Sequence, residues 1–102
     1  MNLGEAIKKV RESQGISQDK ISELTGINQG HVSQIENNHR TTTLRTVERF
    51  AKVLGLPVPV LIWLSLDESD VDESKRAAFM SIKKPVDEML KTFFLDTLNV
   101  EK

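Results

Sequence analysis

The sequence predicts an all-α protein, and three observations lead to that prediction. Residues that start helices recur at short intervals, and apolar residues recur with helical spacing. Strand signals are nearly absent, because the 102 residues include no tyrosine, no Asn-Gly or Asp-Gly pair and little alternation of apolar and polar residues. We therefore expect a first domain of five helices over residues 1–66. One or two further helices should form an extension over residues 67–102.

The first three helices are each predicted from a polar cap at the start and a break at the end. These signals place the helices between Asn2 and Gly15, between Ser17 and Gly26, and between Asn28 and Asn37. Ile21 and Leu24 give the second helix an apolar face, and Val32 and Ile35 do the same for the third. Three short helices in quick succession are therefore expected.

Two more helices complete the first domain. After the polar loop 38–42, Thr43 is the natural cap of a fourth helix that ends at Gly55. Its inward face is expected to consist of Leu44, Val47, Phe50, Ala51 and Leu54. A short, nearly all-apolar fifth helix follows, from Val58 to about Leu64.

The extension begins with an acidic segment and continues as helix. Ser69 has the properties of a helix cap, so we expect a helix from there to about Lys83, with Pro85 ending or kinking it. Beyond the proline, the apolar spacing predicts an amphipathic helix. Its apolar stripe comprises Val86, Met89, Leu90, Phe93, Phe94, Thr97 and Leu98.

Charge is unevenly distributed along the chain, although the net charge is only −1. Residues 1–64 carry eight Lys and Arg against six Asp and Glu, whereas residues 65–102 carry six against nine. A near-zero net charge argues against a protein that simply coats nucleic acid. It does not argue against one basic contacting face.

Several classes of protein are disfavoured by what the chain contains. Cysteine is absent, and His31 and His39 lack ligand partners at suitable spacing, so we expect no disulfide and no metal. The start of the sequence has no secretory pattern, and its longest apolar run is too short to span a bilayer. No nucleophile–base pattern or phosphate-binding glycine loop is visible, so we expect neither an enzyme nor a bound cofactor. A soluble, cytoplasmic protein is expected.

The third helix has an unusual outward face. With Val32 and Ile35 inward, the opposite side is polar but uncharged, and it carries Gln29, Gly30, Ser33, Gln34 and Asn37. A purely solvated face would more often carry Lys and Glu. Amide side chains can bind adenine N6 and N7 together in the major groove of DNA, which discriminates between bases by ~1–3 kcal/mol. This face is therefore a candidate for reading base sequence.

Residues 3–64 resemble the phage-repressor-like Cro/CI (XRE-type) helix-turn-helix regulators. The residues that carry the resemblance are Arg11, Gly15, Ser17-Gln18, Ile21, Gly26-Ile27, Val32-Ser33, Ile35-Glu36-Asn37, Thr43-Leu44 and Ala51-Lys52-Val53-Leu54-Gly55. The resemblance implies a five-helix, lambda-repressor-like DNA-binding domain. Double-stranded DNA is the partner that it implies.

The resemblance also implies a role for individual residues. Positions that face base edges are occupied by Gln29, Gly30, Ser33 and Gln34. Positions that contact the DNA backbone are occupied by Gln18, Asn28, His31, Asn37, His39, Arg40, Thr43 and Arg45. Arg11 and Glu36 match a structural ion pair between the first and third helices. Gly30 departs from the pattern, because a base-contacting side chain usually stands there.

The apolar surplus of the fifth helix and the extension suggests a twofold interface, which the resemblance implies for the fifth helix. The predicted interface residues are Val60, Leu61, Trp63, Leu64, Met89, Leu90, Phe93 and Phe94. The alternative is that the extension folds back and covers the fifth helix within one chain. A membrane-lying role for the last helix is weaker, because its acidic residues outnumber Lys91.

The sequence thus favours a transcriptional regulator, most simply a repressor, that binds a palindromic operator as a homodimer. Two copies would place their third helices about one DNA turn (~34 Å) apart. A second interpretation is an antitoxin-type module whose C-terminal helices bind a partner protein. A third, a regulator of restriction-modification genes, differs in genomic neighbourhood and not in physics.

Overall fold

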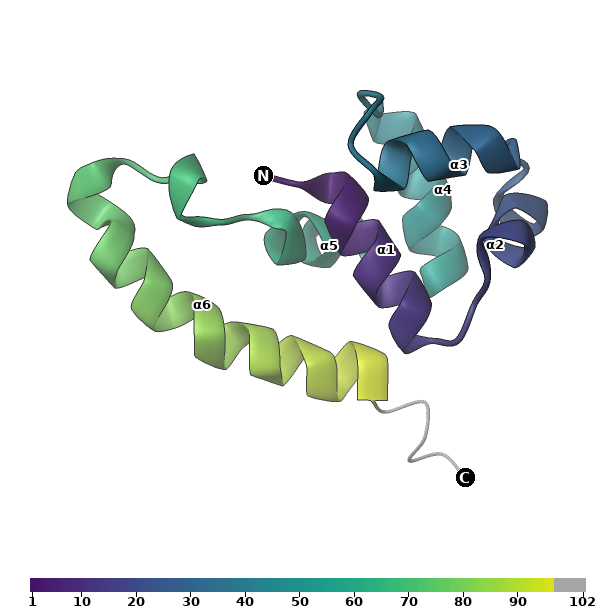
Figure 1. Cartoon of the computed structure of the whole chain (residues 1–102). Coiled ribbons are helices and arrows are strands. Elements are labelled where there is room, and N and C mark those ends of the chain that lie inside the picture. Colours follow the sequence, from purple (N-terminus) through teal and green to yellow (C-terminus); the bar gives the residue numbers. More distant parts are fainter. Residues whose placement is uncertain (97–102) are drawn as a thin grey trace. The chain divides into compact units, whose positions relative to one another are not determined.

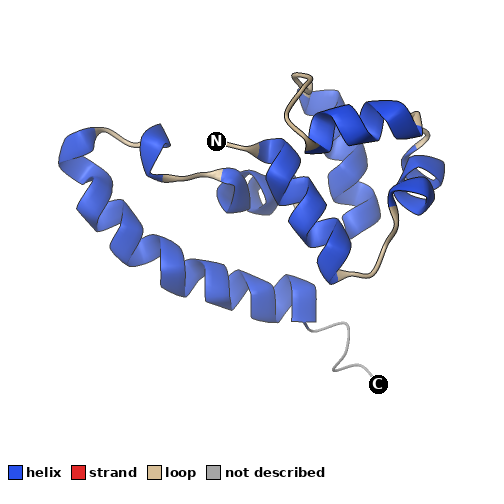
Figure 2. Ribbon diagram, viewed as in Figure 1, coloured by secondary structure: helices blue, strands red, loops and turns tan. Residues whose placement is uncertain are grey.

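The computed structural model describes residues 1–96, and its regular secondary structure there consists of helices joined by loops (Figure 2). No strand occurs in this part of the chain, so the predicted all-α class is confirmed. The backbone divides into two compact units. We call residues Asn2–Ser65 the N-terminal unit, and Met1 together with the chain from Leu66 onward the C-terminal unit.

The N-terminal unit consists of the five helices α1 to α5 (Figure 1). They are α1 Leu3–Ser13, α2 Gln18–Thr25, α3 Gln29–Glu36, α4 Leu44–Leu54 and α5 Val58–Ser65. Helix α1 packs on α3, α4 and α5, whereas α2 packs on α3 and α4. Short helices at several crossing angles therefore enclose one core.

Side-chain caps start four of these helices, as the sequence predicts. Asn2 Oδ1 accepts a hydrogen bond from Glu5 N, and Ser17 Oγ accepts one from Lys20 N. Asn28 Oδ1 accepts from Gly30 N, and Thr43 Oγ1 accepts from Thr46 N. Each cap satisfies a backbone N–H that the first helical turn leaves without a partner.

Gly26 makes the sharp turn between α2 and α3. Its φ of 77° lies in the left-handed region, where a side chain would be strained. Two hydroxyls brace the turn. Thr25 Oγ1 donates to Ile21 O and accepts from Ile27 N, and Ser22 Oγ donates to Ile27 O. Positions 22 and 25 thus fix the angle at which α3 leaves α2.

The core of the N-terminal unit is apolar and closely packed. Its largest fully buried side chains are Ile7, Ile21, Val32, Ile35, Phe50 and Leu61. Two predicted inward residues are wrong, because Leu24 and Leu44 are exposed. Both fit the apolar spacing of their helices, but Leu24 lies near the end of α2 and Leu44 is the first residue of α4. Buried neighbours already fill the core beside them.

Gly4 marks the closest approach of two helices. A Cβ at this position would stand 1.9 Å from the carbonyl oxygen of Ile35 and 3.0 Å from its carbonyl carbon. Backbone atoms at such distances cannot yield, so α1 can cross α3 here only without a side chain. Gly4 therefore sets the spacing between α1 and the end of α3.

The C-terminal unit differs from the prediction at its start. Two short 3₁₀ turns, Glu68–Asp70 and Glu73–Lys75, precede α6, which runs from Arg76 to Leu90. The helix does not begin at Ser69, because the backbone N–H of Ser69 donates to Asp67, and Asp67 caps a separate turn. Val71 is then extended, with φ −120° and ψ 140°, and this interrupts the helical backbone.

Pro85 does not end the helix either. Helix α6 runs through it to Leu90 and is followed by a π-helical turn, Lys91–Asp96. Proline removes one hydrogen bond to the carbonyl of residue 81, but Ser81 and Pro85 are both exposed, so water can reach that carbonyl. The extension thus has one α-helix with a continuation. The predicted stripe residues Thr97 and Leu98 lie outside the described residues.

Candidate nucleic-acid interface

Helix α3 presents its amide face outward. Val32, Ile35 and Glu36 are buried and anchor one side of the helix. On the other side, Gln29, Gly30, Gln34 and Asn37 are exposed and Ser33 is half-buried. The helix is only eight residues long, so its orientation depends on these anchors and not on its own stability.

A buried ion pair ties α1 to α3. Arg11 donates from Nε to Glu36 Oε2 at 2.7 Å and from Nη2 to Glu36 Oε1 at 2.9 Å. Its Nη1 donates to the carbonyl of Ile16 at 2.7 Å. The hydrogen bonds and charge of Glu36 raise the pKa of the Arg11 guanidinium. Both partners are buried, so this bidentate contact fixes the position of the α3 C-terminus.

Gln18 extends this contact to the outward face. Its Nε2 donates to Glu36 Oε1 at 2.9 Å, and its Oε1 accepts from Gln29 Nε2 at 2.8 Å. A carboxylate can only accept, so Glu36 sets the direction of the Gln18 amide, and Gln18 in turn sets that of Gln29. Gln29 keeps its Oε1 and one N–H for another partner. That is the donor–acceptor pair an adenine edge requires.

The other end of α3 is tied to the loop that follows it. Arg40 Nε donates to Gln34 Oε1 at 3.1 Å, and the His39 backbone N–H donates to the Gln34 carbonyl at 2.8 Å. Asn38 adopts a positive φ of 61°, which turns the chain back over the helix end. Gln34 is thus held beside a cation. To accept a hydrogen bond from a base, its amide oxygen must either release Arg40 or accept from Arg40 and the base at the same time.

The predicted backbone-contacting residues are grouped at the two ends of α3. Gln18 begins α2 and Asn28 caps α3 at one end, while Asn37, His39, Arg40, Thr43 and Arg45 follow the other end. Gln18 and His31 are half-buried and the others are exposed. The loop 37–43 joins the end of α3 to the start of α4 (Figure 1). Helix N-termini favour anions, so they suit phosphates on either side of a groove.

Gly30 has a local structural reason. Its N–H donates to the Asn28 cap at 2.8 Å, and an added Cβ would lie 3.1 Å from the same Asn28 oxygen. The cap therefore leaves little room for a side chain at this position. Because Gly30 has no side chain, the outward surface of α3 is recessed between Gln29 and Gln34.

Residues 7–61 match the model of a family described as helix-turn-helix. The chain belongs to the XRE-type helix-turn-helix family. It is similar to control protein C.SmaI from Serratia marcescens, with 30% identity over 60 residues, which cover 59% of this chain and 71% of that protein. It is also similar to the HTH-type transcriptional regulator PuuR from Escherichia coli (strain K12), with 32% identity over 53 residues.

Family and relatives together make this chain a DNA-binding transcriptional regulator. The match to PuuR covers 52% of this chain but only 29% of PuuR, so the chain spans less than a third of that relative. The match to the family stops within α5. The extension that follows must therefore be interpreted from its own residues.

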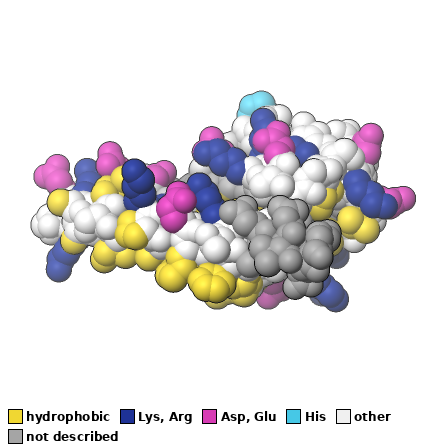
Figure 3. All heavy atoms as spheres, turned by 90° about the horizontal axis from the view of Figure 1, so that it is seen from below, with side chains coloured by type: hydrophobic (Ala, Val, Ile, Leu, Met, Phe, Trp, Pro, Cys, Tyr) yellow, Lys and Arg dark blue, Asp and Glu magenta, His cyan; other side chains and the backbone are white. Residues whose placement is uncertain are grey.

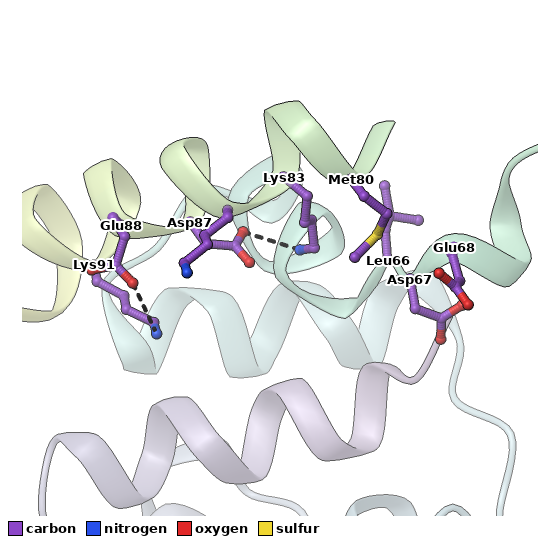
Figure 4. A pocket seen from close by; sticks show the side chains of 9 residues that line it. Leu66, Asp67, Glu68, Met80, Lys83, Asp87, Glu88 and Lys91 are labelled. Carbon is purple, nitrogen blue, oxygen red and sulfur yellow. Dashed lines mark hydrogen bonds and ion pairs between the residues drawn. The ribbon is translucent and has the colours of Figure 1, made fainter. Parts of the chain in front are cut away.

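The described part of the C-terminal unit of this XRE-type regulator contains a groove of its own, of mixed charge. This groove is lined by acidic and basic side chains, and Figure 4 shows the ion pairs between them. Lys83 Nζ lies 3.0 Å from Asp87 Oδ1, and Lys91 Nζ lies 3.9 Å from Glu88 Oε2. Because Lys83 and Lys91 each have a carboxylate beside them, and Asp67 and Glu68 add negative charge to the lining, this groove does not suit a phosphate backbone.

The predicted interface residues are of three kinds in the structure. Leu61 is fully buried within the chain itself, so it cannot contact a second copy, and its prediction as an interface residue is wrong. Met89 and Phe93 are exposed. The remaining ones, Val60, Trp63, Leu64, Leu90 and Phe94, are half-buried. The fifth helix is apolar on all sides, so the spacing of its residues does not show that Leu61 faces the core.

Within residues 1–96, no helix is both long enough and apolar enough to cross a membrane. The same residues contain no group of three metal-ligating side chains.

Proposed function

We propose that this chain is a repressor that binds a palindromic operator as a homodimer. In each copy, α3 enters the major groove, and the two half-sites are read one helical turn (~34 Å) apart. Bound at or near a promoter, the dimer blocks the polymerase.

The observation that carries the proposal is the support beneath the amide face. Gln29 is held by Gln18, and Gln18 is held by the buried Glu36. Binding then costs little side-chain ordering, because the amide is already oriented when DNA arrives. We assign base reading to Gln29, Ser33 and Gln34, with Gly30 letting the helix approach the base edges closely.

The DNA backbone would be held at both ends of α3. Gln18, Asn28 and His31 lie at its N-terminal end, and Asn37, His39, Arg40, Thr43 and Arg45 lie at the other. These contacts set the register of α3 on the duplex without reading its sequence. Arg40 has a further role in the proposal, because on reaching a phosphate it releases the amide oxygen of Gln34.

The test compares base-reading and backbone-contacting variants on one selected operator. Gln34→Ala should lower the preference for the operator over a scrambled site by about 5- to 150-fold, as expected for one lost bidentate contact. Arg45→Ala should weaken binding to both DNAs alike and reduce the slope of log affinity against log salt by about 1. Fluorescence anisotropy titrations at several salt concentrations measure both effects.

Lys52→Ala is the matched control for Arg45. Lys52 is an exposed cation on the same helix, in its last turn, about 10 Å further along the helix axis. Its removal should leave both affinity and salt dependence nearly unchanged. If Gln34→Ala weakens operator and scrambled DNA equally, the assignment of base reading to α3 fails.

A further inference from the structure

Helix α6 carries a row of large apolar side chains at the surface. Ile82 is 53% exposed, Met89 is 51% exposed and Phe93, in the following turn, is 62% exposed. Ala78 and Pro85 are exposed as well. We call these five residues the α6 seam. In Figure 3, hydrophobic side chains gather along this part of the chain.

The spacing of the seam places it on one face of the helix. Ala78, Ile82, Pro85 and Met89 follow one another at intervals of four, three and four residues. This is the alternation with which one helix packs along another. Lys84, which is exposed, lies on the opposite face of α6. The seam is therefore an uncharged strip along α6, suited to a second helix.

The order of residues along the seam identifies the kind of helix that fits. We propose that α6 pairs antiparallel with α6 of a second copy, about a twofold axis between Pro85 and Val86. This register places Ile82 opposite Met89 of the second copy, and Met89 opposite its Ile82. It also places the small Ala78 opposite the large Phe93. A twofold interface requires such self-complementarity, in which residue i meets j and j meets i.

The size of the seam also favours a second copy over an unrelated protein. From Ala78 to Phe93 it is about 22 Å long at 1.5 Å per residue, and a helix is about 10 Å wide. The resulting strip of roughly 220 Å² is well below the ~800 Å² per partner of a standard stable interface. Two copies held on one operator need less, because their effective concentration is high. The pairing rests on the proposed function, which supplies that operator.

The absence of cysteine from the chain permits a direct test of the register. Ile82→Cys and Met89→Cys are made separately in the full chain, one with a size tag, and mixed under mild oxidation with and without the selected operator. We expect disulfides between the two different variants to exceed those within either variant by more than tenfold. Lys84→Cys, mixed with Ile82→Cys, is the matched control and should not cross-link.

Each outcome decides the proposal. Disulfides within a variant indicate parallel pairing and overturn it. A random 1:2:1 ratio of the three possible cross-linked dimers also overturns it. So does the absence of cross-links on the operator, which is the result expected of a monomer that pairs only with another protein. As a second measure, Ile82→Lys should weaken operator binding at least tenfold while leaving the affinity for one half-site unchanged.

Failure of the pairing can be told from failure of the proposed function. If the wild type binds a palindrome as two copies and Ile82→Lys does so equally well, the α6 seam is not the interface but the repressor proposal survives. If the cross-links form as expected and no palindrome is selected, the seam survives and the proposed function fails.

Discussion

In the N-terminal unit many large apolar side chains are buried, whereas in the described part of the C-terminal unit every one of them is half-buried or exposed. Between Asn2 and Ser65, thirteen apolar residues form the core. In the C-terminal unit, up to residue 95, the only buried residue is a lysine, Lys83. The polar contacts differ in the same way, because Arg11 and Glu36 join distant helices, while Asp67 and Asp72 cap turns within two residues of themselves.

This difference suggests that the two units have different tasks, the first to position α3 and the second to contact another helix. The N-terminal unit uses packing and a buried ion pair to hold α3 in one orientation, as a reader of DNA requires. In the described part of the C-terminal unit most hydrogen bonds are local, although the Met1 amino group donates to Asp70 Oδ1 at 2.8 Å, and apolar surface remains that another helix can cover. Substitutions in the first unit should therefore change global stability, and those in the second should act locally or on assembly.

The largest effect is expected from Gly4→Ala. The added methyl group would stand 1.9 Å from the Ile35 carbonyl oxygen, so α1 and α3 must separate. We expect a loss of about 3 kcal/mol or more in the free energy of unfolding, at the upper end for overpacking. Urea unfolding followed by the fluorescence of Trp63, the only tryptophan in the sequence, measures it.

Gly30→Ala is the control for this variant. An alanine there meets only the Asn28 side chain, at 3.1 Å, and its higher helix propensity offsets the strain. Its unfolding free energy should stay within about 1 kcal/mol of the wild type. Equal stability of the two alanine variants would show that the crossing of α1 and α3 is not as close as described.

An effect of comparable size is expected from Glu36→Gln. The Glu36 side chain is 0% exposed and accepts hydrogen bonds from Arg11 and Gln18. Glutamine at this position carries no charge to compensate that of Arg11. Its NH2 group would also stand where the N–H groups of Arg11 and Gln18 need an acceptor. Removing one partner of a buried pair costs about 3–5 kcal/mol. Glu12→Gln, at a 57% exposed carboxylate 4.0 Å from the same Arg11, should cost less than about 1 kcal/mol. A similar loss in both variants contradicts the importance of burial.

The smallest effect is expected in the C-terminal unit, from Ser74→Ala. The Ser74 hydroxyl and backbone N–H both donate to Asp72, and the hydroxyl is the main cause that lowers the pKa of Asp72. Ionised Asp72 therefore stabilises its turn above the ordinary Asp pKa, and this is lost as the pH falls through the lowered value. The alanine variant should raise the Asp72 pKa in a carbon-detected NMR titration. Ser81→Ala should not change it, and an unchanged pKa in Ser74→Ala contradicts this account.

The sequence predicts what local chemistry decides. Asn2, Ser17, Asn28 and Thr43 cap helices because a short polar side chain can reach the N–H groups two or three residues on, wherever the helix packs. The same rule does not identify the helix start after α5, because three residues that can act as caps, Asp67, Ser69 and Asp72, lie close together there. There the carboxylates are the caps, and the predicted start at Ser69 is wrong.

What the sequence does not predict depends on contacts between distant residues. Gly4 resembles any glycine near a helix start until α3 is placed against it. The exposure of Leu24 and Leu44 likewise depends on which neighbours fill the core. At the candidate site, the amide face of α3 follows from helical spacing alone. The bonds that orient Gln29 and hold Gln34 beside Arg40 require the folded chain.

The central claim, that α3 of two copies reads a symmetric DNA site, is tested most directly by in vitro selection. The full chain is used to select bound DNA from a random pool, and the recovered sequences are aligned. We expect a palindrome with one fixed spacing, its half-sites centred ~10–10.5 bp apart, and adenines at the positions that Gln29 and Gln34 face. Recovery of DNA without a common sequence, or of a single asymmetric half-site, would contradict it.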